Sequence, residues 1–260
     1  MDHIIECREL CFGYEQDKDI LGDISFTIDK GELITLIGPN GAGKSTFLNC
    51  LCGLLKPRSG KIMLKGNDIS GLSRRQISTA LAYVPQKTSV AFDYSVRDFA
   101  VMGRAAYHSM LESPGESDYE KTDAALRMLG IEELSDRPIN TLSGGEQQKV
   151  CIARALVQEA ELIILDEPTS ALDYGNQMRV LRLVKELSQM GMAILVTSHN
   201  PDHALMLESK VAILEKSGPL EMGSCADILT SEKLSRLYST PLLTVYSPPF
   251  GRSICLPVGL

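Results

Sequence analysis

A glycine-rich segment that ends in lysine and serine is the first feature able to do chemistry. It reads Gly-Pro-Asn-Gly-Ala-Gly-Lys-Ser over residues 38–45 and fits the pattern of a glycine, four residues, then Gly-Lys-Ser. Glycines let successive backbone N–H groups curl around phosphate oxygens, and Lys44 adds a positive charge for the β- and γ-phosphates. The Ser45 hydroxyl can bind Mg²⁺. We therefore expect a nucleoside triphosphate site that also takes Mg²⁺.

The segments on either side of this loop have the patterns of a strand and a helix. Residues 32–37 form a short apolar, β-branched run with the length of a buried strand. After the loop, apolar residues recur at helical spacing until residues 56–60, which read Lys-Pro-Arg-Ser-Gly and end the helix. A helix that begins near Lys44 points the positive end of its dipole at bound phosphates. The alternative is a chance glycine loop, and this strand-to-helix setting weighs against it.

Two adjacent carboxylates follow another apolar run. Residues 162–165 read Leu-Ile-Ile-Leu and are followed by Asp166 and Glu167. A buried strand does not end in two acids without compensation, because removing charge from water is costly. Beside a phosphate loop, Asp166 suits the Mg²⁺ shell and Glu167 suits the attacking water. The alternative is a surface turn after a core strand.

Strand and helix patterns alternate through most of the chain. Residues 80–84 and 193–197 are further apolar runs with the length of buried strands. Between them, residues 177–190 place apolar side chains on one helical face and are followed by Gly191. Alternation of this kind predicts an α/β fold with a mostly parallel sheet.

The middle of the chain has a different pattern. Residues 88–157 are helical in pattern, with a break at residues 113–117, so we expect a helical subdomain inserted into the α/β core. We expect one domain, with its core at about residues 1–87 and 158–240. Residues 241–260 then form a C-terminal tail.

A second glycine-containing segment resembles a family signature. Residues 142–146 read Leu-Ser-Gly-Gly-Glu, are followed by two glutamines, and resemble the signature motif of the ATP-binding cassette (ABC) ATPases. The other elements of that family follow its order, with one departure, Glu146, where glutamine is commoner. We expect this to be tolerated because Ser143 and the glycines hold the phosphate contacts. The matching positions are Tyr14 for adenine stacking, Gln86 in the Q-loop, Asp173 in the D-loop and His199 as the switch histidine.

The resemblance, which covers about residues 4–240, implies a phosphate-loop NTPase core with an N-terminal antiparallel β subdomain. It implies ATP and Mg²⁺ as cofactors, Glu167, His199 and Lys44 as the catalytic residues, and direct attack of water without a phosphoenzyme. The implied metal ligands are Ser45, Gln86 and Asp166. The residues implied to bind nucleotide are Tyr14, Gly38, Pro39, Asn40, Gly41, Ala42, Gly43, Lys44, Ser45, Thr46, Gln86, Ser143, Gly144, Gly145, Glu146 and Asp173.

The signature segment implies a second anion site in each chain. Residues 143–145 precede a helical pattern, and a helix N-terminus attracts anions. Each chain thus has one phosphate loop and one further expected anion site, at residues 143–145. The family pairs two subunits head to tail, so that each ATP lies between the phosphate loop of one copy and the signature of the other. We therefore expect a second copy of the chain as a partner.

Single residues have simpler interpretations as well. Tyr14 could be an ordinary strand aromatic. His199 and His203 are four residues apart and could bind a metal from one helix face, but no third ligand is evident and Pro201 makes a helix at His199 doubtful. The seven cysteines lack zinc-ligand spacing, so we expect buried free thiols.

Charge and composition restrict the partners. The chain has 260 residues and a formal net charge of −7, which makes non-specific nucleic-acid binding unfavourable. It has no apolar run long enough to span a membrane and no secretory signal pattern at its start. We expect it in the cytosol unless a partner holds it at a membrane, and we expect no nucleic-acid partner.

Residues of the helical region indicate a branch of the family. Residues 94–98 and 101–104 resemble the corresponding segments of importers of iron-siderophore, haem and cobalamin complexes. Residues 228–232 resemble the same branch. This implies integral membrane permease subunits as partners, an extracellular or periplasmic binding protein acting indirectly, and a peripheral position on the cytoplasmic face of the inner membrane. The alternatives are a molybdate, tungstate or other importer, a DNA-repair or chromosome ATPase, which would have long coiled coils, and a translation ATPase, which normally has two cassettes.

Overall fold

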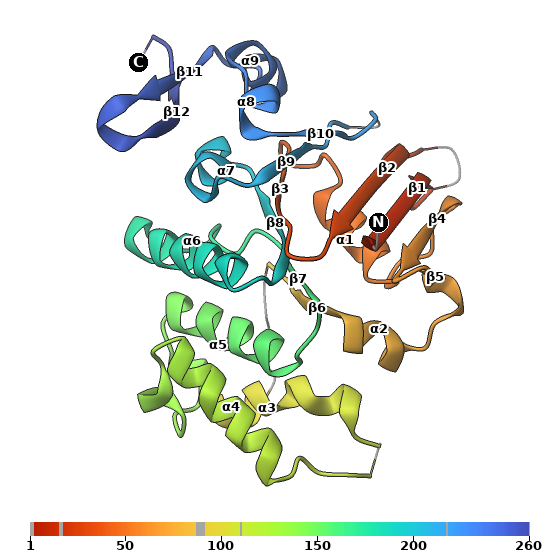
Figure 1. Cartoon of the computed structure of the whole chain (residues 1–260), viewed down its shortest axis with the longest axis vertical. Coiled ribbons are helices and arrows are strands. Elements are labelled where there is room, and N and C mark those ends of the chain that lie inside the picture. Colours follow the sequence, from red (N-terminus) through yellow and green to blue (C-terminus); the bar gives the residue numbers. More distant parts are fainter. Residues whose placement is uncertain (1–2, 16–17, 87–91, 110, 217, 260) are drawn as a thin grey trace.

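A mostly parallel sheet lies at the centre of the molecule (Figure 1). The computed structural model describes residues 3–15, 18–86, 92–109, 111–216 and 218–259. Within them the strand order of this sheet is β10-β9-β3-β8-β7-β6, and only β10 runs antiparallel to its neighbour. This confirms the predicted α/β fold. The strands are β3 (Leu33–Ile37), β6 (Leu81–Val84), β7 (Leu162–Leu165), β8 (Ala193–Ser198), β9 (Lys210–Ile213) and β10 (Glu221–Gly223).

Burial on both faces explains why these strands have continuous apolar sequences. Every residue of β7 and β8 is buried, as expected for parallel strands covered by helices on both sides. One covering helix is α6 (Tyr174–Gln189), which buries Val180, Val184 and two leucines along one face. The carboxyl ends of β3, β7 and β8 lead directly into the loops that contain the predicted chemical groups.

A separate antiparallel sheet packs beside the first helix, as the resemblance implied. Its strand order is β2-β1-β4-β5. Phe26 of this sheet meets Phe47 of α1 (Lys44–Leu51) edge to face, with ring centroids 5.4 Å apart. The sheet therefore supports the helix that follows the phosphate loop. Its strands are β1 (His3–Phe12), β2 (Leu21–Asp29), β4 (Ser59–Leu64) and β5 (Asn67–Asp68).

Helices form the part of the molecule drawn lowest in Figure 1. Arg104 holds them together from a buried position: it bonds to Asp118 at 2.9 Å, to Glu159 at 2.8 Å and to the Val157 carbonyl at 3.1 Å. The expected start of the helical subdomain near residue 88 lies outside the described residues. The helices here are α3 (Val96–Val101), α4 (Glu116–Met128) and α5 (Gly144–Val157), and α2 (Arg74–Ala80) precedes β6.

The C-terminal segment, expected only as a tail, forms a β-hairpin. Strand β11 (Leu242–Ser247) pairs antiparallel with β12 (Arg252–Pro257), and the hairpin packs on α7 and α9. Among the described residues, none belongs to a helix with the length and apolarity needed to span a membrane. The helices of this part are α7 (Pro201–Leu207), α8 (Cys225–Ile228) and α9 (Ser231–Tyr238).

Candidate nucleotide site

The loop of residues 38–45 connects β3 to α1 in a conformation that requires glycine. Gly43 has a φ of 100°, and a Cβ there would lie 2.9 Å from Ile20. A Cβ on Gly38 would lie only 2.4 Å from the Leu214 carbonyl oxygen. The backbone can therefore adopt this tight turn only without side chains at these two positions. The turn ends at the N-terminus of α1, where backbone N–H groups are available to an anion.

Lys44 is held in place at the first residue of α1. Its side chain is buried, and its ammonium group donates to the Gly38 carbonyl oxygen at 2.8 Å. The same nitrogen lies 3.1 Å from Oε1 of Glu167. Lys44 is thus fixed by the loop that it follows and faces the end of β7.

Asp166 directly follows β7 and is bound by hydroxyl groups from both neighbouring strands. It is almost fully buried, and it accepts hydrogen bonds from Thr197 of β8 at 2.8 Å and from Tyr83 of β6 at 3.3 Å. Burial, with the Asp166 charge adding to it, raises the pKa of the Tyr83 hydroxyl, so this group remains a donor. These contacts supply the compensation that a buried carboxylate needs.

Glu167 is the point at which the predicted catalytic groups meet. Its backbone has a φ of 44°, an unusual left-handed conformation, and its N–H donates to the Thr197 hydroxyl at 2.7 Å. Its Oε2 accepts from Gln86 at 3.1 Å and lies 3.4 Å from Nδ1 of His199. With Lys44 on Oε1, three polar side chains from three separate segments surround one carboxylate.

A cavity of about 720 Å³ lies over these groups. Most of the phosphate-loop residues line it, together with Gln86, Glu167 and His199. Lys18, Asp19, Ile20, Ser170 and Lys216 also line it, and the sequence analysis did not single them out. The predicted site residues that line the cavity are Asn40, Gly41, Gly43, Lys44, Ser45, Thr46, Gln86, Glu167 and His199.

Tyr14 lies at the margin of this cavity. Its ring is largely exposed, its hydroxyl is 3.4 Å from the Thr46 hydroxyl, and the Phe12 ring supports it edge to face at 5.0 Å. An exposed aromatic face beside the phosphate loop can stack on a flat base. Tyr14 is therefore available to stack on a base at the margin of the cavity, although it does not line the cavity itself.

The signature residues lie elsewhere in the same chain. Ser143 caps α5, and its hydroxyl and backbone N–H both donate to Glu146, at 2.6 and 2.8 Å. These bonds lower the pKa of the Glu146 carboxyl. Gly145 packs against Asn176, where a Cβ would lie 2.8 Å from the amide. Of the residues lining the nucleotide cavity in the described chain, none belongs to the segment 143–146.

Asp173 also lies apart from the cavity, as the N-cap of α6. It accepts from the backbone N–H of Asn176 at 2.9 Å, and this bond lowers the pKa of its carboxyl. Asp173 and the signature are therefore outside the cavity that the phosphate loop lines, although Gly144 shares a smaller cavity of about 380 Å³ with Gln86 and Glu167.

The two histidines have different surroundings. His199 is half exposed and precedes α7, which begins at Pro201, so the two histidines do not share a helix. His203 is buried and pairs through Nδ1 with the Ser198 hydroxyl at 2.9 Å. Burial, and secondarily the charge of His199, lowers the pKa of His203 to about 4. Among the described residues, no three His, Cys, Asp or Glu side chains are grouped so that they could hold a metal ion.

Thr197, Tyr83 and Ser170 are contacts that the sequence analysis missed. Thr197 bonds to both acids, and Ser170 accepts from Gln86 at 3.2 Å. A signal for Thr197 existed, because a hydroxyl in an otherwise apolar buried strand must find a partner. Tyr83 and Ser170 have no comparable sequence signal, since their partners lie more than 80 residues away along the chain.

The known proteins that this chain resembles are components of ABC transporters. The family model described as ABC transporter matches residues 21–170. An uncharacterised ABC transporter ATP-binding protein of Haemophilus influenzae is 40% identical over 91% of this chain and 90% of its own length. A "probable iron chelatin transport ATP-binding protein" of Helicobacter pylori is 38% identical, over 94% of this chain and 96% of its own. The inward-facing structure of a "metal-chelate type ABC transporter" is 33% identical, with a TM-score of 0.87, and covers 100% of this chain and 98% of the other.

Proposed function

Because the chain belongs to the ABC transporter family, we propose that it is the ATP-hydrolysing subunit of an importer for a metal chelate. The observation that carries the proposal is the meeting of Lys44, Gln86 and His199 around Glu167 beside the phosphate loop. A carboxylate held this way at the mouth of a triphosphate pocket can polarise a water molecule. An iron chelate is proposed as cargo because one relative is described as an iron chelatin transport protein and a similar structure as a metal-chelate type transporter.

The phosphate loop would hold the triphosphate of ATP. Backbone N–H groups of residues 38–45 would bind its oxygens, with Lys44 as the positive charge and Tyr14 stacking on adenine. Burial of Lys44 supports this role, because its charge acts strongly where water is excluded. Thr46 and the remaining loop residues would complete the pocket.

The donor set beside Lys44 fits Mg²⁺. Ser45 and Gln86 line the cavity, and Asp166 is adjacent in sequence to Glu167, which also lines it, so a hydroxyl, an amide and a carboxylate would supply oxygen ligands. Mg²⁺ bound there would neutralise charge on the leaving diphosphate. Thr197 and Tyr83 would keep the Asp166 carboxylate oriented for that task.

Hydrolysis would proceed by direct attack of water in line with the bond to the leaving diphosphate. Glu167 would accept the proton of this water, and Lys44 would stabilise negative charge on the transferring phosphoryl group. His199, which is half exposed at the cavity, would contact the γ-phosphate and orient it. No covalent phosphoenzyme is part of this route.

Two copies of the chain would complete each site. Ser143, Gly144, Gly145 and Glu146 lie apart from the cavity of their own chain, together with Asp173, and α5 begins there with a helix N-terminus. A C₂ pair places the signature of one copy over the phosphate loop of the other, twice. This pairing would give each of the two proposed anion-binding segments of a chain a role in an ATP site.

The helical region would contact integral permease subunits on the cytoplasmic face of the membrane. The chain would be peripheral there, and a separate extracellular or periplasmic protein would select the cargo. Gln86 supports the connection, because it bonds to Glu167 and Ser170 and precedes the segment that leads to α3. Loss of the γ-phosphate could then rotate the helices as a rigid body.

Co-purification with the permease, followed by uptake in vesicles, tests this function. Tagged chain should bring down its permease from membranes, and reconstituted vesicles should take up a ferric chelate only with ATP inside the compartment that contains this subunit. Lys44→Ala should abolish both hydrolysis and uptake, since it removes the charge on the phosphates. Near-normal hydrolysis by Lys44→Ala would reject the site, and ATP-driven uptake of another solute would reject only the cargo.

A further inference from the structure

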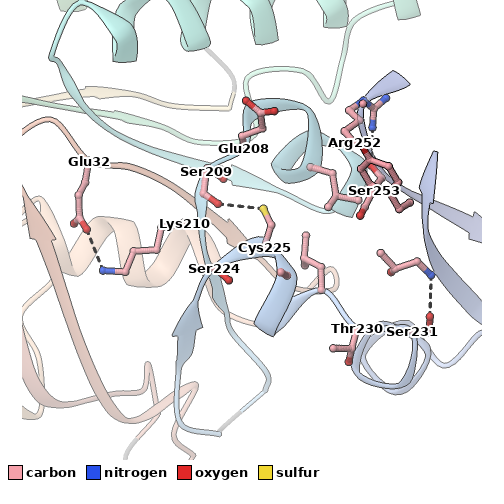
Figure 2. A pocket seen from close by; sticks show the side chains of 16 residues that line it. Glu32, Glu208, Ser209, Lys210, Ser224, Cys225, Thr230, Ser231, Arg252 and Ser253 are labelled. Atoms are coloured by element: carbon pink, nitrogen blue, oxygen red, sulfur yellow. Dashed lines mark hydrogen bonds and ion pairs between the residues drawn. The ribbon is translucent and has the colours of Figure 1, made fainter. Parts of the chain in front are cut away.

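A second cavity, of about 1000 Å³, lies between the C-terminal hairpin and the helices α7, α8 and α9 (Figure 2). We call it the hairpin cavity. Among the described residues, none that lines it also lines the nucleotide cavity, so the two spaces are separate. Its volume lies at the upper end of the range that is typical of small-molecule pockets.

Hydrogen bonds fix the hairpin that forms one wall of this cavity. The Thr244 N–H donates to the Ser231 hydroxyl of α9 at 2.9 Å, a bond drawn in Figure 2. On the other strand, the Cys255 N–H donates to Asp202 of α7 at 2.9 Å. The fold itself therefore holds the walls of the cavity in place, as in pre-formed ligand pockets.

Two carboxylates line the hairpin cavity, and each already has a cationic partner. Glu32 pairs with Lys210 at 3.0 Å, as Figure 2 shows, and Glu208 pairs with Lys185 at 2.7 Å. Their charges are thus compensated within the chain. Neither carboxylate makes the cavity unfavourable for an anion.

Arg252 also lines the hairpin cavity, and it has no carboxylate partner among the described residues. Its side chain is half-buried, and it donates to the Ser253 carbonyl oxygen at 3.0 Å. A guanidinium has five N–H donors, so others remain free to bond. Because a partly buried cation without an anion is costly, the cavity has a positive charge that an anionic ligand would balance.

Hydroxyl groups next to Arg252 supply further polar contacts. Tyr246 and Ser253 are paired across the two strands, and both line the cavity. Neither hydroxyl has a hydrogen-bond partner in the part of the chain that the structure describes. The Ser231 hydroxyl accepts from the Thr244 N–H and keeps its own hydrogen for another acceptor. The cavity therefore combines one free cation with several groups that can bond to ligand oxygens.

We propose that the hairpin cavity binds a small monocarboxylate that also has several hydroxyl groups, such as a sugar acid. The planar fork of Arg252 matches a carboxylate through two parallel N–H···O bonds. The hydroxyls of Ser231, Tyr246 and Ser253 can bond to the hydroxyl groups of the same molecule. Since this site is separate from the nucleotide cavity, the inference goes beyond the proposed function and does not rest on it.

A phosphate ester is the less suitable ligand. A phosphate monoester has a charge of about −1.5 to −2 at pH 7, so it needs more than one cation. The other cation that lines the cavity in the described chain, Lys210, is already paired with Glu32. The single charge of a monocarboxylate is the one that Arg252 balances.

Ligand-detected NMR titration of the full chain tests the site. The probes are D-gluconate, D-glucuronate and D-galactonate, with D-glucitol as the neutral counterpart of gluconate. At least one acid should bind saturably with a Kd of about 1 mM or lower, as expected for molecules of this size. D-Glucitol should bind at least about tenfold more weakly than gluconate, because it lacks the carboxylate. The proposal is wrong if none of the three acids binds saturably up to about 20 mM, roughly twentyfold the expected Kd.

Three variants assign the binding to this cavity. Arg252→Gln should raise the Kd of the acid at least about tenfold, because neutral hydrogen bonds replace charge-assisted ones. Arg182→Gln removes the same charge from an exposed position on α6 and should bind the acid like the wild type. Thr244→Val is a control inside the cavity, because the Thr244 hydroxyl is buried and has no partner among the described residues. Equal Kd values for Arg252→Gln and Arg182→Gln would overturn the inference.

Competition with a fluorescent ATP analogue shows which cavity the acid occupies. The acid should leave the bound analogue in place, and Arg252→Gln should bind the analogue like the wild type, which shows that its fold is intact. Displacement of the analogue by the acid would place the acid in the nucleotide cavity and overturn the inference. Failure of the wild-type chain to bind the analogue would reject the proposed function, while the acid titration would still decide on the hairpin cavity.

Discussion

At the scale of single residues, Glu167 joins the groups that sequence spacing keeps apart. Lys44 comes from α1, Gln86 follows β6 and His199 follows β8, yet all three lie within 3.4 Å of its carboxylate. The left-handed backbone of Glu167 aims the side chain into the cavity, and the Thr197 hydroxyl holds its N–H. Strain at one residue thus positions the proposed base.

Replacing this carboxylate should separate binding from turnover. Glu167→Gln retains size and polarity but cannot accept a proton, and a positioned base contributes about 10²–10⁴-fold to rate. We expect ATP hydrolysis to slow at least about a hundredfold while ATP affinity is retained. Phosphate release and fluorescent-nucleotide titration measure the two quantities. Glu161→Gln, which alters an exposed pair with Lys65, is the control, and wild-type turnover of Glu167→Gln would reject the base assignment.

Thr197 offers a test of positioning without touching substrate. Thr197→Val retains shape but removes the bonds to Asp166 and to the Glu167 N–H, so kcat should fall while KM for ATP changes little. Thr35→Val is the matched control, because Thr35 is equally buried and its hydroxyl bonds to Ser209, away from the two acids. Both variants should lose similar stability by thermal unfolding. Equal kcat values in the two variants would show that Thr197 has only a structural role.

At the scale of elements, the helical region is held by an ion-pair network around one buried arginine. Arg104 bonds to Asp118, Glu159 and a backbone carbonyl and stacks on Tyr107 at 3.8 Å. Removing one member of a buried pair leaves the other charge without compensation. The network therefore fixes α4 against the end of α5, which begins at the signature.

Substitution of this arginine should destabilise the fold. Arg104→Leu should lower the free energy of unfolding by about 3 kcal/mol, measured by urea denaturation, because the buried Asp118 loses its guanidinium partner and retains only its bonds to His108 and to the Gly115 N–H among those the structure describes. Arg97→Leu is the matched control: Arg97 also pairs with an aspartate, Asp123, but both side chains are about a third exposed. Its loss should cost about 1 kcal/mol or less. Equal costs would mean that burial of Arg104 contributes nothing.

At the scale of the whole molecule, nucleotide and permease contacts must be connected across the chain. Gln86 is suited to this because it touches Glu167 and Ser170 and precedes the helical region. The hairpin bond to Asp202 would add a second connection, from the His199 segment to the far end of the chain. Both connections pass through segments that follow strand ends of the central sheet.

Gln86→Ala should weaken the coupling of hydrolysis to transport. ATP binding should remain, because the phosphate loop is intact, while the number of cargo molecules imported per ATP hydrolysed should fall severalfold. Vesicles that contain the whole transporter, assayed for uptake and phosphate together, provide the ratio. Gln76→Ala, at the capped start of α2, serves as the control. An unchanged ratio in Gln86→Ala vesicles would count against this role.

The sequence alone was sufficient for the local parts of this protein. The phosphate loop, the two acids after β7 and the signature segment are short patterns, and the α/β alternation follows from strand and helix periodicity. Each depends on residues within about ten positions of one another, so local spacing is enough to identify it.

Only the tertiary structure decided which distant groups meet. Thr197 holds both acids, Tyr83 reaches Asp166, and Arg104 is buried, because sheet order and helix packing bring together segments remote in sequence. The C-terminal hairpin escaped prediction for a related reason. The pairing of β11 with β12 depends on the helices α7 and α9 against which the hairpin packs, and a two-stranded hairpin has too short an alternating pattern to be identified without them.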